Sequence, residues 1–160
     1  LIPPTPEPTT HIAGQRGLDT DILAVDTLTF PYDNPSKALF FASGVDIAPD
    51  GTIYTCTIHG DVWRVTGVDA SLKSLHWQRF ATGLYQPLGL KVRNGEIFVL
   101  GRDHITRLHD RNADGIARFH GFVGDHFLLR RAYGEENERG RVVANESHAL
   151  RPRSGIVLQA

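Results

Sequence analysis

The stretch Gly44–Val65, GVDIAPDGTIYTCTIHGDVWRV, is repeated in looser form at Gly89–Leu108, GLKVRNGEIFVLGRDHITRL. The two copies begin 45 residues apart (89 − 44), and a repeat of this size is typical of one unit of a β-propeller. With a one-residue gap in each of two turns, identical or similar residues coincide: Gly44/Gly89, Val45/Leu90, Ile47/Val92, Gly51/Gly95, Ile53/Ile97, Tyr54/Phe98, Cys56/Leu100, Val62/Ile105, Arg64/Arg107 and Val65/Leu108. The repeat predicts an all-β fold, an incomplete β-propeller of about two four-stranded blades.

Turn residues divide each copy into short strands. The first unit covers about residues 40–81, and its Pro49-Asp50-Gly51 and His59-Gly60 pairs place glycine where a tight turn needs a positive φ. The second unit covers residues 82–117, and Asn94-Gly95 is a strong signal for a two-residue hairpin. The predicted strands are Gly44–Ala48, Thr52–Thr57, Asp61–Val65, His76–Ala81, Leu90–Arg93, Glu96–Leu100 and His104–His109, with a fourth strand of the second unit expected after Ala117.

The two ends of the chain differ from the repeat in composition and in residue pattern. Residues 1–20 begin with LIPPTPEPTT and predict an irregular, Pro/Thr-rich linker, whereas Val25–Phe30 alternates apolar and polar residues and predicts a strand before the blades of region 21–117. Residues 118–160 lose the blade pattern and are dense in Arg and Glu. We expect an atypical tail there, either disordered or a frame-shifted stretch that is not the native continuation.

Composition limits the function classes. The chain of 160 residues has 17 Lys and Arg against 18 Asp and Glu, so the overall charge gives no case for a nucleic-acid partner. No apolar stretch approaches the roughly 20 residues that a transmembrane helix needs. A single cysteine, Cys56, excludes an internal disulfide and leaves no Cys-x-x-Cys-His haem-attachment motif; its match to Leu100 predicts a buried strand position.

Residues 21–117 resemble the propeller of bacterial proteins related to glucose/sorbosone dehydrogenases. These include membrane-bound dehydrogenases whose propeller is joined to a c-type cytochrome module. The resemblance is carried by AVDTLTFP, CTIHGDVWRVTGVD, RFATGLYQPLGLKV, FVLGRDHITRLHD and DRNADG. It implies a fragment of an extracytoplasmic, periplasmic oxidoreductase of the sugar or alcohol dehydrogenase type, with quinone- or haem-linked chemistry. The implied partners are the remaining blades or a cytochrome module that this chain does not contain.

The sequence also departs from that family. Two units cannot close a propeller ring, which typically has 4–8 blades, and neither the haem motif nor the family's histidine-based catalytic cluster is found. The catalytic residues and the cofactor are therefore unknown, and the isolated chain is not expected to be active. Two alternatives stay open, a non-catalytic binding or scaffold propeller and a truncated product with no independent activity.

A candidate metal loop follows the predicted strand His104–His109 of the second unit. Asp110, Asn112 and Asp114 place oxygen ligands at alternate positions before Gly115, a spacing that suits calcium. The resemblance implies an Asp at the position of Arg118, and a cation there removes a ligand and repels the ion, so any calcium site should be weak. The alternative is an Asx-rich turn in which these side chains bind nearby backbone groups.

The predicted loops also contain candidate ligand-binding residues. Arg102, Asp103 and His104 form a run in the turn before the third strand of the second unit, where they could position an anionic or sugar substrate. Gln86 lies in the loop that leads from one unit to the next. Each has a structural alternative, a charge-satisfied turn for the run and packing between blades for Gln86. Asp46, Arg64 and Arg107 are expected to form ion pairs between strands.

Overall fold

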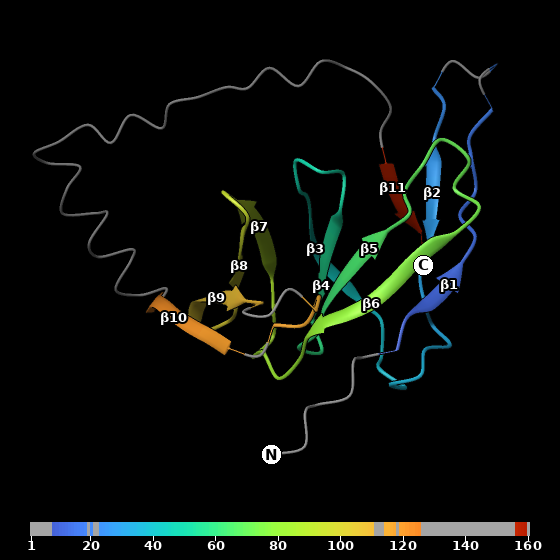
Figure 1. The fold of residues 1–160 in the computed structure, drawn as a ribbon. Helices are drawn as coiled ribbons and strands as arrows, with labels where there is room; N and C mark the ends of the chain where they lie inside the picture. The colour runs from blue at the N-terminus through green and yellow to red at the C-terminus, as the bar shows by residue number, and fades with distance from the viewer. Residues whose placement is uncertain are drawn as a thin grey trace, which may run out of the picture.

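The computed structural model describes residues 8–18, 20, 23–110, 114–117, 119–125 and 156–159. Over these residues the chain is all-β, as predicted, and has no helix. Its strands are β1 (Thr10–Ile12), β2 (Asp26–Thr29), β3 (Ala42–Ile47), β4 (Ile53–Thr57), β5 (Val62–Thr66), β6 (Leu75–Ala81), β7 (Gly89–Arg93), β8 (Glu96–Leu100), β9 (His104–His109), β10 (Phe119–Asp125) and β11 (Ile156–Gln159). Figure 1 shows the two larger sheets, β3–β6 in teal to green and β7–β10 in olive to orange.

The first sheet has the order β1-β6-β5-β4-β3 and is antiparallel throughout. The bounds of β3 to β6 lie within two residues of the strands predicted for the first unit. Aromatic and β-branched side chains suit such a half-buried pleated surface, and Trp63, Val65 and Trp77 are at most 1% exposed. The alternation of these residues therefore located the strands correctly.

Strand β1 differs from the linker expected over residues 1–20. Thr10 lies opposite Trp77 and Ile12 opposite Leu75, so β1 adds a fifth strand beside β6. A sheet edge presents unpaired N–H and C=O groups, and those of β6 give even a three-residue segment a partner. The Pro/Thr-rich composition did not indicate this pairing. Residues 1–7 lie outside the described residues.

The second sheet has the order β10-β9-β8-β7. Its fourth strand, β10, follows Ala117 as predicted and pairs antiparallel with β9. Residues 119–125 therefore belong to the sheet and not to a disordered tail. Most of the predicted tail, residues 126–155, lies outside the described residues, and β11 beyond it pairs in parallel with β2.

The Asn94-Gly95 hairpin forms as the sequence predicts. Both residues have positive φ, 53° at Asn94 and 77° at Gly95, which is the pattern of a type I′ turn. This turn sets the register in which Arg93 pairs with Glu96 and Gly89 with Leu100.

The two sheets meet along β3 and β7, which lie side by side in the same direction. Ser43 Oγ donates to the Pro87 carbonyl over 2.7 Å, and three residues further along β3 the Asp46 carboxylate accepts from the Val92 amide over 2.7 Å. Between these bonds the matched glycines touch, because a Cβ built on Gly44 would lie 2.8 Å from Gly89 Cα. Corresponding positions of the two repeats are therefore brought together.

Two cores stabilise this arrangement. The core between the two sheets contains Cys56, Val62, Phe80, Ala81, Ile97, Val99, Leu108 and Ala117. The other lies on the far side of the first sheet, where residues 28–40 cover it, and contains Leu28, Phe30, Phe40, Ile53, Trp63, Val65, Leu72, Leu75 and Trp77. The central strands β4, β5 and β6 of the first sheet are thus covered on both faces, whereas Val45 and Ile47 of the edge strand β3 are 47% and 48% exposed.

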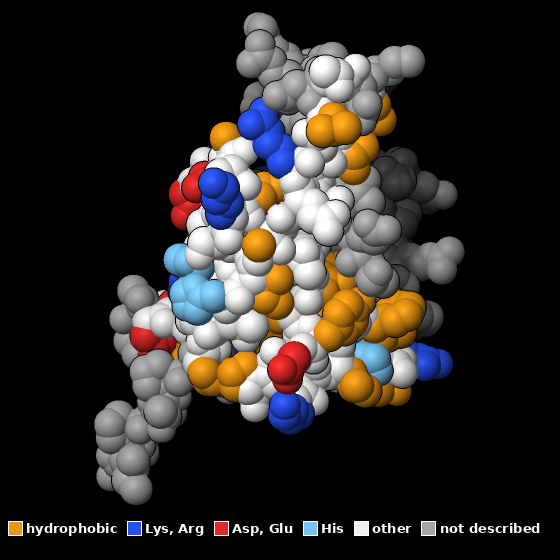
Figure 2. Space-filling model, turned by 90° about the vertical axis from the view of Figure 1, so that its right-hand side faces the viewer, with side chains coloured by type: hydrophobic (Ala, Val, Ile, Leu, Met, Phe, Trp, Pro, Cys, Tyr) orange, Lys and Arg blue, Asp and Glu red, His pale blue; other side chains and the backbone are white. Residues whose placement is uncertain are grey.

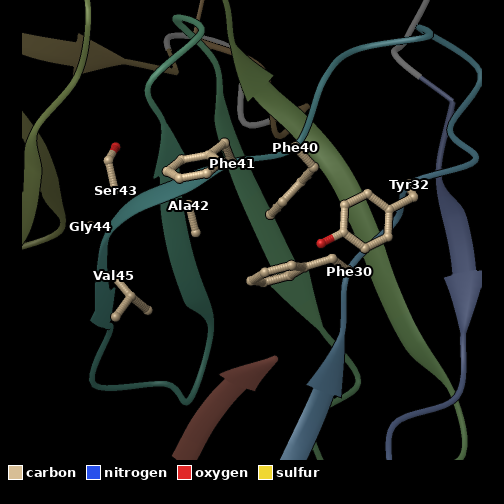
Figure 3. A pocket seen from close by; sticks show the side chains of 8 residues that line it. All are labelled: Phe30, Tyr32, Phe40, Phe41, Ala42, Ser43, Gly44 and Val45. Carbon is tan, nitrogen blue, oxygen red and sulfur yellow. The ribbon is translucent and has the colours of Figure 1, made fainter. Parts of the chain in front are cut away.

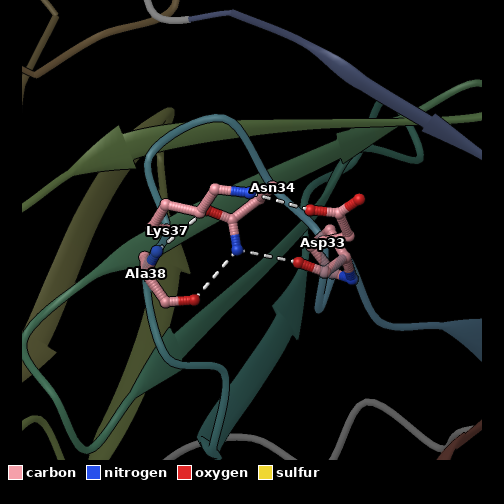
Figure 4. Close-up of polar contacts among 5 residues, drawn as sticks. Asp33, Asn34, Lys37 and Ala38 are labelled. Carbon is pink, nitrogen blue, oxygen red and sulfur yellow. Dashed lines mark hydrogen bonds and ion pairs between the residues drawn. The ribbon is translucent and has the colours of Figure 1, made fainter.

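The loop between β2 and β3 is organised by a buried asparagine. Asn34 is 1% exposed; its Nδ2 donates to the carbonyls of Pro31 and Ala38, both over 2.9 Å, and its Oδ1 accepts from the Ala38 amide. Figure 4 shows these bonds beside the exposed Lys37–Asp33 ion pair. The loop between β2 and β3 is therefore held by the side chain of Asn34, which returns the chain from Phe30 to Phe40.

No sheet closes on itself within the described part of the chain. The chain direction places the connectors 82–88 and 101–103 at one end of the second sheet, and the 94–95 turn and the loop after His109 at the other. The two groups of candidate residues from the sequence therefore lie at opposite ends of one sheet and cannot form a single site.

Candidate functional site

Four candidate residues meet at the end of the second sheet where β7 begins. Arg102 Nη1 donates to Gln86 Oε1 over 3.0 Å, which joins the turn after β8 to the connector before β7. In the same turn His104 Nδ1 lies 2.8 Å from Asp103 Oδ1. The structure thus brings together the residues that the sequence singled out in two separate loops.

The backbone holds these two loops in place. The Arg102 amide donates to the Tyr85 carbonyl over 3.1 Å, and the Gly101 amide to the His104 carbonyl over 2.9 Å. Gln86 has a φ of 43°, which is uncommon for a residue with a side chain. Such conformations persist where the surroundings over-determine them and are frequent at ligand sites. The position of the Gln86 amide group is therefore set by its neighbours.

The polar groups of this end are accessible. Arg102 and Asp103 are exposed, and His104 and Gln86 are partly buried. Two apolar side chains stand beside them, Tyr85 and Leu88, which are 56% and 52% exposed. Sequence reasoning missed Tyr85, although its place directly before Gln86 in the connector was a usable signal. We call Tyr85, Gln86, Arg102, Asp103 and His104 the connector cluster.

The predicted calcium loop lies at the opposite end of the sheet. Asp110 Oδ2 accepts from the Gly115 amide over 2.7 Å, and Asp114 Oδ1 accepts from the Ile116 amide over 3.0 Å. Both carboxylates thus make the local backbone bonds of an Asx-rich turn. Asn112 lies outside the described residues, and within those described no three His, Cys, Asp or Glu side chains are grouped as a metal site requires. The calcium hypothesis gains no support, and the alternative of an Asx-rich turn describes these bonds.

A cleft of about 240 Å³ runs between the sheets near this loop. Its walls include Tyr54 and Arg64 from the first sheet, and His109 and Asp110 from the second. Burial raises the pKa of the Tyr54 phenol, which keeps it protonated. The Arg64 guanidinium lies against Gly115, where a positive charge opposes the binding of a metal ion.

The expected ion pairs among Asp46, Arg64 and Arg107 do not form. Asp46 is bound by Lys91 over 3.0 Å, Arg107 lies 3.3 Å from Glu96, and Arg64 donates to Gln78 Oε1 over 2.6 Å. Strand register explains why Asp46 and Arg64 do not pair. Tyr54 lies between them, so the two charges are two strands apart.

The single cysteine has a structural place in the core. Cys56 is 0% exposed, as its match to Leu100 predicts, and burial raises the pKa of its thiol, so it is a poor nucleophile at neutral pH. A hollow of about 420 Å³ lies beside β3 and is lined mostly by apolar groups from Phe30 to Val45. Figure 3 shows Phe30, Phe40 and Tyr32 grouped on one side of it and Phe41 and Val45 on the other.

Apolar surface also occurs away from these sites. Figure 2 shows the side of the molecule that lies at the right in Figure 1, where apolar side chains gather with only scattered charges between them. Among the residues that the structure describes, the most exposed large apolar side chains are Leu18, Leu23, Leu39 and Phe41, each at least 65% exposed. Within the described residues no helix has the length and apolar character needed to cross a membrane.

Comparison of the chain with protein-family models, with curated proteins and with solved structures gives no match. Its function is therefore inferred from the residues and their geometry.

Proposed function

We propose that the chain forms two consecutive blades of a β-propeller. Three observations support this: each repeat forms an antiparallel sheet with its strands in sequence order, β3 and β7 run side by side in one direction, and the matched glycines Gly44 and Gly89 are in contact. Propeller blades follow one another in this way around a central axis, with the first strand of each blade innermost.

We further propose that the connector cluster binds a small hydroxylated or anionic ligand, such as a sugar or a sugar acid. The observation that carries this proposal is the Arg102–Gln86 bond of 3.0 Å. It joins an exposed cation from one loop to the side-chain amide of a residue in another loop whose backbone has a positive φ. Loops at the ends of a rigid sheet commonly provide ligand contacts.

The side chains of the cluster suit that ligand class. A guanidinium presents several N–H donors in a plane and binds carboxylates or adjacent hydroxyls. Asp103 and His104 add an acceptor and a ring nitrogen within 2.8 Å of each other. Tyr85, a residue that is 56% exposed, offers an aromatic ring for the C–H face of a sugar.

The resemblance to glucose/sorbosone dehydrogenases directs the choice of ligand to sugars and their acids. Oxidoreductase chemistry, electron transfer to a cytochrome module and an extracytoplasmic location stay predictions from that resemblance. No contact among the described residues bears on them. The binding function is the alternative that the arrangement of the loops favours.

The test is a titration of the chain with glucose and gluconate, followed by NMR chemical shifts and calorimetry. We expect binding in the millimolar range for a single exposed site of this kind, about −4 kcal/mol. Arg102→Ala should weaken it about tenfold, the loss of roughly one charge-assisted hydrogen bond. The matched control is Lys73→Ala, which removes an exposed cation at the other end of the first sheet. Equal shifts with both variants, or no response to either ligand, would refute the proposal.

A further inference from the structure

The two faces of the second sheet are covered unequally. The face that packs on the first sheet is fully or almost fully buried, with Ile97, Val99 and Leu108 at most 4% exposed. Strand pairing places Leu100 and Ile105 opposite each other on the other face, with Phe98 next along β8. These three side chains are only partly buried. They line a hollow of about 250 Å³ together with Gly89, Leu90 and Lys91.

Comparison with the matched positions of the first sheet shows how the exposed face of the second sheet differs. Leu100 and Ile105 occupy the positions of Cys56 and Val62 in the first sheet. Cys56 and Val62 are 0% exposed, because they belong to the core between the two sheets. The same two positions in the second sheet have no sheet against them in the described part of the chain.

The matched glycines differ in the same way. A Cβ on Gly44 would meet Gly89 Cα at 2.8 Å, whereas a Cβ on Gly89 would have no heavy atom within 4 Å. A strand residue without a side chain weakens a strand and commonly marks a close approach of another backbone. The open space beside Gly89 therefore corresponds to the space that Gly89 itself fills beside Gly44.

We propose that Phe98, Leu100 and Ile105, around Gly89, form the docking surface for a further copy of the repeat unit. The partner is an antiparallel sheet that sets a glycine against Gly89 and aliphatic side chains against Leu100 and Ile105. We expect the docking face of this partner to resemble the face of the second sheet that packs on the first, which carries Ile97, Val99 and Leu108. The inference rests on the propeller arrangement proposed above.

A second whole copy of this chain does not fit the surface. The part of a copy that would have to dock is the face of its first sheet that carries Ile53 and Val65, the counterparts of Ile97 and Leu108. That face already packs against Leu28, Phe30 and Phe40 in the same core. A further repeat unit, whether in the same polypeptide or another, has the free face that docking requires.

The first test measures the accessibility of a thiol on this surface. Leu100→Cys is introduced into the full chain, and into a full chain that carries a second copy of residues 82–125 inserted after Asp125. We expect the thiol to react readily with a maleimide in the first protein and about tenfold more slowly or less in the second, because a covered thiol reacts only when its cover opens. Leu39→Cys, 66% exposed on the far side of the first sheet, should react equally in both.

The second test needs no added unit and stands if the extended chain does not fold. In the unmodified chain, Leu100→Asp should lower the melting temperature by no more than about 2 °C, because the surface is uncovered. Val99→Asp, one residue away but 0% exposed, should lower it by roughly 10 °C or more. If Leu100→Asp and Val99→Asp lowered the melting temperature equally, the surface would already be covered. If the Leu100→Cys thiol reacted with maleimide at the same rate in both chains, a further repeat would not cover it. Either result overturns the proposal, while the sugar titration of the same chains tests the connector cluster separately.

Discussion

The carboxylate of Asp46 joins strand β3 of the first sheet to strand β7 of the second by a hydrogen bond. Its Oδ2 accepts from the Val92 amide over 2.7 Å, and Lys91 Nζ lies 3.0 Å from it. Burial acts to raise the pKa of Asp46, but the hydrogen bonds from Val92 and Lys91 outweigh it and hold the pKa below its ordinary value of 3.8. The ionised form is thus favoured in the folded chain.

Replacing Asp46 with alanine should destabilise the chain by about 1–3 kcal/mol, because it leaves the Val92 amide without its acceptor. Urea unfolding at neutral pH measures this loss. Asp50→Ala is the control, since Asp50 is exposed and its hydrogen bonds to Thr52 stay within its own turn. If the two variants lost the same free energy, the bond between the sheets would contribute nothing beyond a turn.

The acid dependence of stability provides a second measurement on Asp46. A carboxyl group whose pKa is lower in the folded than in the unfolded state stabilises the fold above its unfolded pKa, and this stability is lost as the pH falls through the folded pKa. The difference in stability between the natural chain and Asp46→Asn should therefore be constant above about pH 5 and shrink below the ordinary aspartate pKa. A difference that grew on acidification would contradict this assignment.

At the scale of single residues, the sequence predicted where side chains lie better than which partners they bind. Gln86, Arg102, Asp103 and His104 do gather at one end of the sheet. The expected pairing of Asp46 with Arg64 failed because alternation along a strand gives the face of a residue but not its neighbour across the sheet. Lys91, the actual partner, comes from the other repeat, and only tertiary structure brings it near.

The turn between β4 and β5 connects an element of the first sheet to the connector before β7. Gly60 has a φ of 107°, and a Cβ there would lie 2.5 Å from the Leu84 carbonyl oxygen. The Gly60 carbonyl in turn accepts from the Leu84 amide over 3.1 Å. The turn thus needs glycine for two reasons, its backbone conformation and its contact with the connector.

Gly60→Ala should therefore cost more than the roughly 1–2 kcal/mol of a left-handed conformation alone. Gly51→Ala is the matched control, since Gly51 has a φ of 85° but a Cβ added there would have no heavy atom within 4 Å. Thermal unfolding of the two variants separates the costs. A loss for Gly60→Ala no larger than for Gly51→Ala would show that the connector moves freely away from the turn.

Among the elements, those with local signals were predicted and those defined by a distant partner were not. The strands β3 to β9 have alternating side chains between glycine turns, which sequence patterns capture. Strands β1 and β11 are three and four residues long. They exist through pairing with β6 and β2, far away along the chain. Short segments of this kind have too few residues to show a period.

For the whole molecule, matched residues of the two repeats are expected to contribute equally to stability only where the packing around them is also repeated. Gly44 and Gly89 test this statement, because neither requires a positive φ and only the space beside each differs. In the first sheet that space is filled by the second. In the second sheet it is open, so the same substitution at the two matched positions measures how each sheet is covered.

Gly44→Ala should destabilise the chain by about 1–3 kcal/mol, because its Cβ meets backbone atoms that move only if the sheets separate. Gly89→Ala should stay within about 0.5 kcal/mol of the natural chain, since a surface substitution in open space removes no contact. Urea unfolding of both variants supplies the comparison. In the chain extended by a second copy of residues 82–125, Gly89→Ala should instead become as costly as Gly44→Ala, because the added sheet then occupies the open space. If Gly89→Ala were costly already in the natural chain, the second sheet would be covered by another part of the molecule, and the two repeats would not be successive blades with an open end.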